Sequence, residues 1–206
     1  KWMPDRLGKG ARIGFDPWLH TIGEVKSLET AVAKFGGALV PLEANPIDAI
    51  WDDQPEPPLG TVTIQPLEFA GKTAREKIED MKAALAKAGA DATVLTDPSS
   101  LAWIFNIRGA DVPHTPVALG FAIIKAVGEP LVFLDVRKLP VKTKAYLTQL
   151  CELVPPENIE AALVEVAAGK TVALDPALAA DRSRRLVVAA GGTVIEEQDP
   201  ARLPRA

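Results

Sequence analysis

The fold prediction depends on residues 97–125, D-P-S-S-L-A-W-I-F-N-I-R-G-A-D-V-P-H-T-P-V-A-L-G-F-A-I-I-K. Asp97-Pro98 predicts the start of a helix, because the Asp side chain accepts from unpaired backbone N–H groups and Pro suits the first helical position. Gly109 and the two prolines that follow it cannot continue a helix and predict an extended loop. The apolar run Phe121–Ile124 predicts a strand. This stretch therefore places a turn-rich loop between a buried helix and a buried strand.

The loop carries the candidate functional residues, which are Trp103, Arg108, Asp111 and His114. Loops held by rigid elements often carry function. One interpretation of Arg108 from the residues alone is that its guanidinium pairs with Asp111 across a tight turn and holds the loop. The Asp111–His114 spacing offers at most two ligands of a metal site that needs more. The sequence therefore predicts no metal site, and the weaker alternative of a small α/β hydrolase acting through Asp111 and His114 stays open.

Composition narrows the class of protein. The chain has 206 residues, a hydrophobic fraction of 48% and a net charge of −4, so it can bury a core but does not suit a nucleic-acid or anionic membrane surface. Its single cysteine, Cys151, excludes an internal disulfide and fits a reducing compartment. No apolar window is long enough for a membrane helix, and we expect a cytoplasmic location.

Strand and helix patterns alternate along the chain and predict an α/β fold with a mixed sheet flanked by helices. Thr73 and Glu76 form a capping box that opens a helix, and Gly89 closes it. The segment 128–130, G-E-P, predicts a hairpin between two strands. The segment 53–66 is rich in Pro and lacks periodicity, which predicts a connection between domains.

The end of the chain repeats its beginning. Residues 12–17, R-I-G-F-D-P, match residues 171–176, T-V-A-L-D-P, and both copies continue to a Gly-Gly followed by a strand. The sequence therefore predicts a strand–helix–strand ending used twice, although D-P and G-G are also ordinary helix start and stop signals. A long stretch, 67–170, precedes the second copy and only a short one precedes the first. We therefore expect the first copy to be cut at its N-terminal side.

Three segments carry a family resemblance: N-P-I-D-A-I-W at 45–51, F-A-G-K at 69–72, and A-W-I-F-N-I-R-G at 102–109 with Asp111 and H-T-P-V at 114–117. They resemble the non-catalytic part of the three-domain Xaa-Pro aminopeptidases. The resemblance implies that 1–65 is the C-terminal part of a first N-terminal α/β domain and that 66–206 is a complete second, or middle, domain of the creatinase/prolidase N-terminal type.

The resemblance also implies a function for the parent enzyme. Such enzymes are metallopeptidase hydrolases that remove the residue preceding proline from peptides, with a dinuclear metal site, commonly manganese, in a pita-bread catalytic domain. We expect that domain to be absent here, so that this chain alone supplies no metal ligand or cofactor and is inactive. Expected partners are the catalytic domain of the same polypeptide, a second subunit in a homodimer and a peptide substrate.

By the same resemblance, the loop at 106–117 is expected at the rim of the catalytic cleft. Trp103, Arg108, Asp111 and His114 would then limit substrate access. The alternative is a stand-alone peptide- or protein-binding module of the pseudo-aminopeptidase type.

Overall fold

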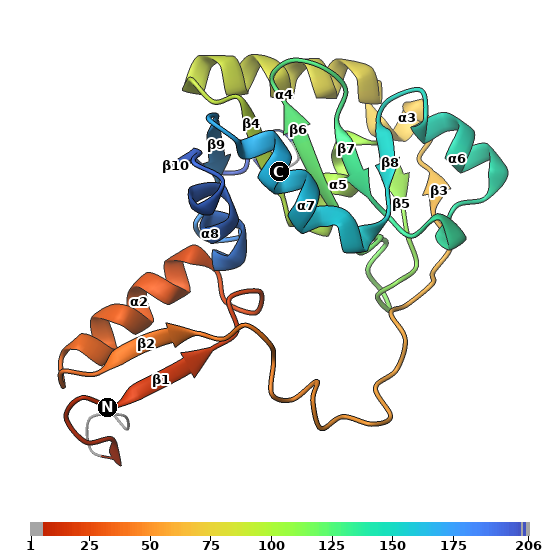
Figure 1. Cartoon of the computed structure of the whole chain (residues 1–206). Coiled ribbons are helices and arrows are strands. Elements are labelled where there is room, and N and C mark those ends of the chain that lie inside the picture. The colour runs from red at the N-terminus through yellow and green to blue at the C-terminus, as the bar shows by residue number, and fades with distance from the viewer. Residues whose placement is uncertain (1–5, 203, 205–206) are drawn as a thin grey trace.

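A six-stranded mixed sheet forms the centre of the structure, which is a computed structural model that describes residues 6–202 and 204 (Figure 1). The strand order is β10-β9-β4-β6-β7-β8, and β6 runs antiparallel to both of its neighbours while the other pairs are parallel. The predicted α/β class with a mixed sheet is confirmed. The strands are β4 (Ala92–Leu95), β6 (Phe121–Lys125), β7 (Leu131–Phe133), β8 (Glu152–Val154), β9 (Thr171–Leu174) and β10 (Thr193–Glu196).

Helices cover both faces of this sheet. Successive strand residues point to opposite faces, so Ile124 of β6 packs in one core with Ile78, whereas Ile123 packs in the other with Leu163. The first core lies under α4 (Ala74–Ala88), α5 (Pro98–Ile104) and α6 (Val141–Leu147), and the second under α7 (Ile159–Ala167) and α8 (Asp181–Ala189). The result is a three-layer α/β/α arrangement. No helix in the described ranges is long and apolar enough to cross a bilayer.

Local sequence signals place the helix ends where they were predicted. The Thr73 hydroxyl accepts from the Glu76 N–H at 3.2 Å and the Glu76 carboxylate accepts from the Thr73 N–H at 2.9 Å, which starts α4. Gly89 ends it in the left-handed conformation, with φ +69°. The Asp97 side chain accepts from the Ser99 N–H at 2.8 Å and starts α5.

The hairpin predicted around residues 128–130 is confirmed by the antiparallel pair β6 and β7, but three other short strands were not predicted. β3 (Thr63–Ile64) lies inside the segment predicted to be irregular and pairs antiparallel with β5 (Ile107–Arg108), and β8 was also missed. Residues 45–51 form a hydrogen-bonded turn, with Ile50 N donating to Ile47 O at 3.1 Å. The remaining short helices are α3 (Leu67–Ala70), η1 (Val136–Lys138) and η2 (Pro156–Asn158). The division of the chain at residue 65 stays a prediction.

The sequence repeat is a structural repeat. β1 (Arg12–Phe15), α2 (Ile22–Ala33) and β2 (Ala38–Pro41) match β9, α8 and β10, and both strand pairs are parallel. The matched strands even have the same register, since Arg12 lies opposite Ala38 and Thr171 opposite Thr193. The loops match as well, because Asp16 accepts from the Trp18 N–H and Asp175 from the Ala177 N–H, each at 2.8 Å.

The two copies meet at a junction with local two-fold symmetry, which we call the pseudo-twofold junction (Figure 1). When Asp16 is matched to Asp175, Thr21 is matched to Ala180, and these two residues form an antiparallel bridge with each other. Four backbone hydrogen bonds surround the bridge, and exchanging the copies converts each into another. They run from Ile22 N to Ala179 O (3.0 Å), Asp181 N to His20 O (2.9 Å), Gly23 N to Pro176 O (2.8 Å) and Arg182 N to Pro17 O (2.8 Å).

Candidate functional site

The start of the predicted loop is anchored by a buried lysine. Lys77 of α4 is only 2% exposed, and its Nζ donates to Trp103 O at 3.0 Å and to Asn106 Oδ1 at 2.7 Å. The same ammonium lies 4.3 Å from the centroid of the Trp103 ring. Burial, followed by the positive charges of Arg108 and Lys72, lowers the pKa of Lys77. This cation therefore stabilises the partly negative C-terminal end of α5.

Arg108 lies at the same end of α5. Its Nη1 donates to Ile107 O at 2.8 Å and to Ala102 O at 3.4 Å. Pairing of Arg108 with Asp111, which was one interpretation of the sequence, is wrong: among the described residues Arg108 forms no ion pair, and the Asp111 carboxylate binds elsewhere. The guanidinium is oriented by main-chain carbonyls instead.

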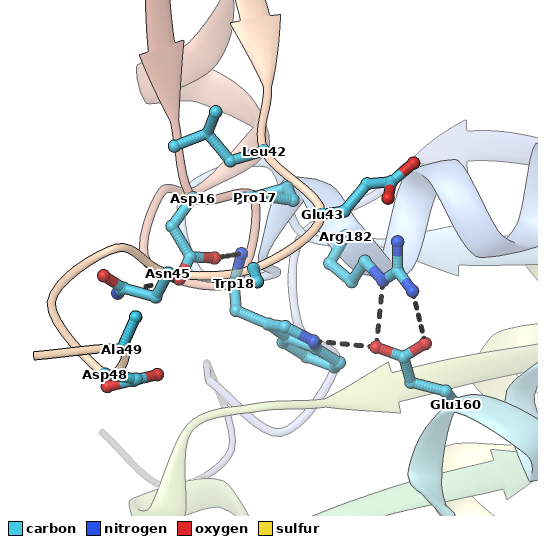
Figure 2. Close-up of a pocket in the computed structure, with 11 residues that line it drawn as sticks. Asp16, Pro17, Trp18, Leu42, Glu43, Asn45, Asp48, Ala49, Glu160 and Arg182 are labelled. Atoms are coloured by element: carbon cyan, nitrogen blue, oxygen red, sulfur yellow. Dashed lines mark hydrogen bonds and ion pairs between the residues drawn. The ribbon is translucent and has the colours of Figure 1, made fainter.

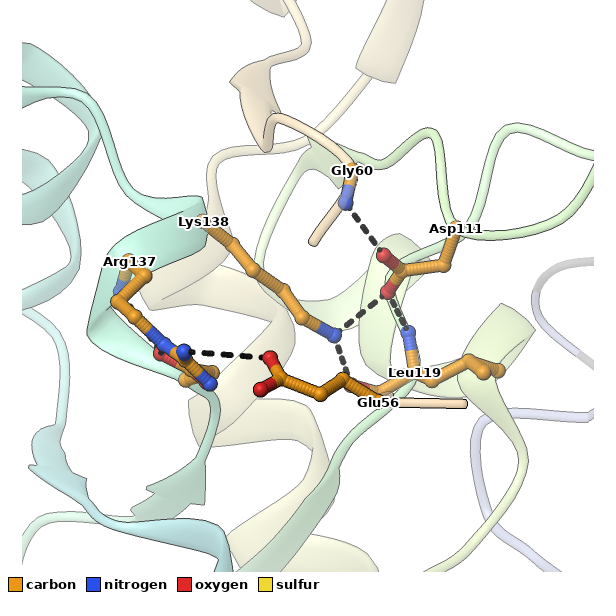
Figure 3. A network of polar contacts seen from close by, with 7 residues as sticks. Glu56, Gly60, Asp111, Leu119, Arg137 and Lys138 are labelled. Carbon is orange, nitrogen blue, oxygen red and sulfur yellow. Dashed lines mark hydrogen bonds and ion pairs between the residues drawn. The ribbon is translucent and has the colours of Figure 1, made fainter. Parts of the chain in front are cut away.

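Asp111 holds the far end of the loop (Figure 3). Its side chain is fully buried and accepts from Gly60 N at 2.9 Å, from Leu119 N at 2.7 Å and from Lys138 Nζ at 2.7 Å. We call these four residues the Asp111 clamp. The clamp ties the segment before β3 and the end of the loop to η1, and Glu56 adds an exposed contact to Arg137 at 3.9 Å.

His114 lies at the exposed tip of the loop, in a turn closed by Thr115 N donating to Val112 O at 3.2 Å. Its φ of +62° is unusual for a residue with a side chain. The structure thus brings Trp103 and Arg108 together beside Lys77, whereas Asp111 and His114 serve separate positions. Asp111 is taken up by three donors and does not suit a metal ligand, and no group of three or more His, Cys, Asp or Glu residues in the described ranges could hold a metal ion.

A cavity of about 540 Å³ lies between the two copies, at the carboxyl ends of β1 and β2 (Figure 2). Trp18 Nε1 donates to Glu160 at 2.9 Å, and Arg182 Nε donates to the same carboxylate at 2.9 Å. Arg182, together with Trp18, lowers the pKa of Glu160. Asn45 Nδ2 donates to Asp16 Oδ2 at 3.0 Å on the opposite wall. Sequence reasoning missed this cavity because its polar groups come from distant segments.

A second cavity, of about 500 Å³, lies at the carboxyl edge of the large sheet, where open α/β sheets commonly bind ligands. Its wall includes the side chains of Pro57, Pro98, Phe121 and Pro156. Lys138 also lines it, so this cavity lies next to the Asp111 clamp. The prolines of the connecting segment were the only sequence signal for it.

Comparison with known proteins finds relatives that are named as aminopeptidases. "Probable Xaa-Pro aminopeptidase P" of Arthroderma gypseum is 34% identical over 175 residues, which are 84% of this chain and 27% of the relative. "Aminopeptidase P1" of Lotus japonicus is 34% identical over 148 residues, 72% of this chain and 22% of the relative. The chain thus spans about a quarter of the length of these curated relatives.

A solved structure has the same fold. The X-prolyl aminopeptidase from Caenorhabditis elegans, described as a cytosolic enzyme with a di-nuclear active site, aligns with a TM-score of 0.86 and 24% identity over 100% of this chain and 34% of its own. The sequence model named Creatinase/Prolidase N-terminal domain matches residues 53–206. The chain therefore belongs to the creatinase/prolidase N-terminal domain family.

Proposed function

We propose that this chain is the non-catalytic N-terminal and middle region of a cytoplasmic Xaa-Pro aminopeptidase. The observation that carries the proposal is its identity of 34% to "Probable Xaa-Pro aminopeptidase P" over most of its own length but only 27% of the relative. The part of the relative that this chain does not match is long enough to contain the hydrolytic centre. In this proposal a catalytic domain of the same polypeptide holds a dinuclear metal site, with manganese as the expected metal, and the enzyme is a homodimer.

The contribution of this region is to shape access to the active site. Trp103 lies in the last turn of α5 and Arg108 ends β5, and the loop that follows them is fixed at its start by Lys77 and at its far end by the Asp111 clamp. Such fixed ends keep contact residues in one geometry, which is what discrimination between peptides requires. Residues of this loop would line the entrance, and the peptide would bind with proline in its second position.

Two measurements test the proposal. The 206-residue chain, incubated with manganese and an Xaa-Pro peptide, should show no turnover, and turnover at the rate of a complete enzyme would contradict it. In the longer polypeptide, Trp103→Ala should change kcat/KM for long peptides by about fivefold or more, because truncating an aromatic contact costs at least about 1 kcal/mol. Trp51→Ala, at an exposed position at the end of the turn formed by residues 45–51, is the matched control.

A second candidate function is a stand-alone peptide-binding module, which the cavity of about 500 Å³ favours. The coding sequence after Ala206 separates the two. A stop codon supports the module, and a further domain with paired Asp, His and Glu residues supports the peptidase.

A further inference from the structure

The end of α5 carries positive charge without an acidic partner. Lys77 and Arg108 form no ion pair with any carboxylate among the described residues, although the chain as a whole has a net charge of −4. Lys138 of η1, which is also buried, does have such a partner in Asp111. The two cations at the end of α5 therefore form a local excess of positive charge that the described chain does not neutralise.

The guanidinium of Arg108 is oriented but only partly used. Its Nη1 donates to the carbonyls of Ile107 and Ala102, and its Nε and Nη2 make no hydrogen bond to any described residue. The guanidinium is planar, and its Nε and Nη2 hydrogens point in parallel, which matches the two oxygens of a carboxylate. Arg108 is part-exposed, and neither Nε nor Nη2 is a buried atom among the described residues, so this edge is accessible to a ligand.

Lys77 and Trp103 complete the surroundings. The Lys77 ammonium is buried, so water screens its positive charge only weakly. This charge therefore makes the electrostatic potential around Arg108 more positive. Burial and the nearby charge of Arg108 lower the pKa of Lys77, which is consistent with two close cations that lack a counter-ion. Trp103 is partly buried against the core and offers an apolar flank beside them.

We propose that the Nε–Nη2 edge of Arg108, beside the Lys77 ammonium and the Trp103 ring, is a binding site for a carboxylate. Two sources supply that chemistry: the carboxylate of an incoming peptide, or an Asp or Glu side chain of the catalytic domain against which the loop packs. The site itself follows from the residues present here, and only the choice of source rests on the proposed function.

The test uses the ¹⁵N-labelled 206-residue chain. The Arg108 Nε–H and Trp103 indole N–H signals are recorded during addition of sodium N-acetylglycinate, with N-acetylglycinamide at equal ionic strength as the neutral control. The site predicts a saturable shift of both signals with the carboxylate and none with the amide. Equal shifts with both probes, or no saturable shift with either, overturn the proposal.

Three variants sharpen the result. Arg108→Gln should weaken carboxylate binding roughly tenfold or more. Arg108→Lys should weaken it less, because the charge remains while the planar fork is lost, and it keeps the test valid if Arg108→Gln does not fold by its amide spectrum. Arg137→Gln, which removes an exposed guanidinium paired with Asp135, should leave the response unchanged. A response that survives both Arg108 variants overturns the proposal.

The same titration in the longer polypeptide identifies the source. If the Arg108 signal shifts when the carboxylate is added, the site is assigned to peptides. If the signal already has the chemical shift of the saturated 206-residue chain and does not change on addition, the site is assigned to a carboxylate of the catalytic domain. Failure here is separate from failure of the proposed function, because the Trp103→Ala kinetics test substrate access without reference to carboxylate binding.

Discussion

Removing the carboxylate of the Asp111 clamp should remove much of the stability of the fold around the six-stranded sheet. Asp111→Ala leaves the Lys138 ammonium, only 5% exposed, without its counter-ion. Breaking a buried ion pair by removing one partner costs about 3–5 kcal/mol. The N–H groups of Gly60 and Leu119 also lose their acceptor, which costs about 1–3 kcal/mol for a buried group. Because water can enter the space and the terms are not additive, we expect a loss of about 4 kcal/mol in the free energy of unfolding.

Urea unfolding followed by circular dichroism measures this loss, and two comparisons isolate its cause. In a Lys138→Met background the cost of Asp111→Ala should fall to about 2 kcal/mol, since no charge is then stranded. Asp80→Ala is the matched control, because the Lys72–Asp80 pair has a similar separation of 2.6 Å but side chains 53% and 50% exposed. That variant should leave the unfolding midpoint unchanged.

The reasoning is refuted if Asp111→Ala costs less than about 1 kcal/mol, the range of an exposed pair. It is also refuted if the cost is the same with Lys138 and with Met at position 138. Either result would mean that the clamp is not the buried, charge-compensated arrangement that the contacts in Figure 3 describe.

Three further predictions concern single residues. The pKa of Lys77 is lowered in the folded chain, so between that pKa and the ordinary value of 10.5 the unfolded chain binds more protons than the folded chain. The free energy of unfolding should therefore rise with pH across this window. Lys77→Met should flatten this rise, as urea unfolding at several pH values would show. Gly109→Ala should destabilise by about 1–3 kcal/mol, because a Cβ there would lie 2.4 Å from Ala118 N, whereas Gly8→Ala meets nothing within 4 Å and should be neutral in the same assay. Cys151 is buried and its pKa is raised to about 12, so iodoacetamide should modify it only in the unfolded chain, as mass spectrometry with and without urea would show.

Local signals were sufficient to predict much of the fold. The capping box at Thr73, the Gly89 helix end and the Asp97 helix start each depend on residues within one helical turn of one another, and such patterns are readable from sequence. β3 and β5 have two residues each and β8 has three. Strands this short show no alternation, and only their partners in space define them.

The contacts of the candidate residues could not be predicted from the sequence. Arg108 and Asp111 are close in sequence and opposite in charge, which favoured a local pair. The structure instead joins Asp111 to Lys138 across the fold and turns Arg108 toward the carbonyls of Ile107 and Ala102. Buried Lys77 was not singled out, because nothing in a helical pattern tells a buried lysine from an exposed one until the element packed against it is known.

The pseudo-twofold junction shows a further limit of the repeat. Its backbone bonds are symmetric, but the side chains around it are not: Lys26 pairs with Glu196, whereas the residues matched to them are Arg185 and Pro41, which cannot form an ion pair. Arg185 instead lies over the ring of Phe15, 5.5 Å from its centroid. If two molecules associated through their second copies, the Lys26–Glu196 pair would be absent. Two arginine-rich α8 helices would then face each other, and their like charges would oppose association. The symmetry therefore resides in the backbone, while the side chains now select the first copy as the partner of the second.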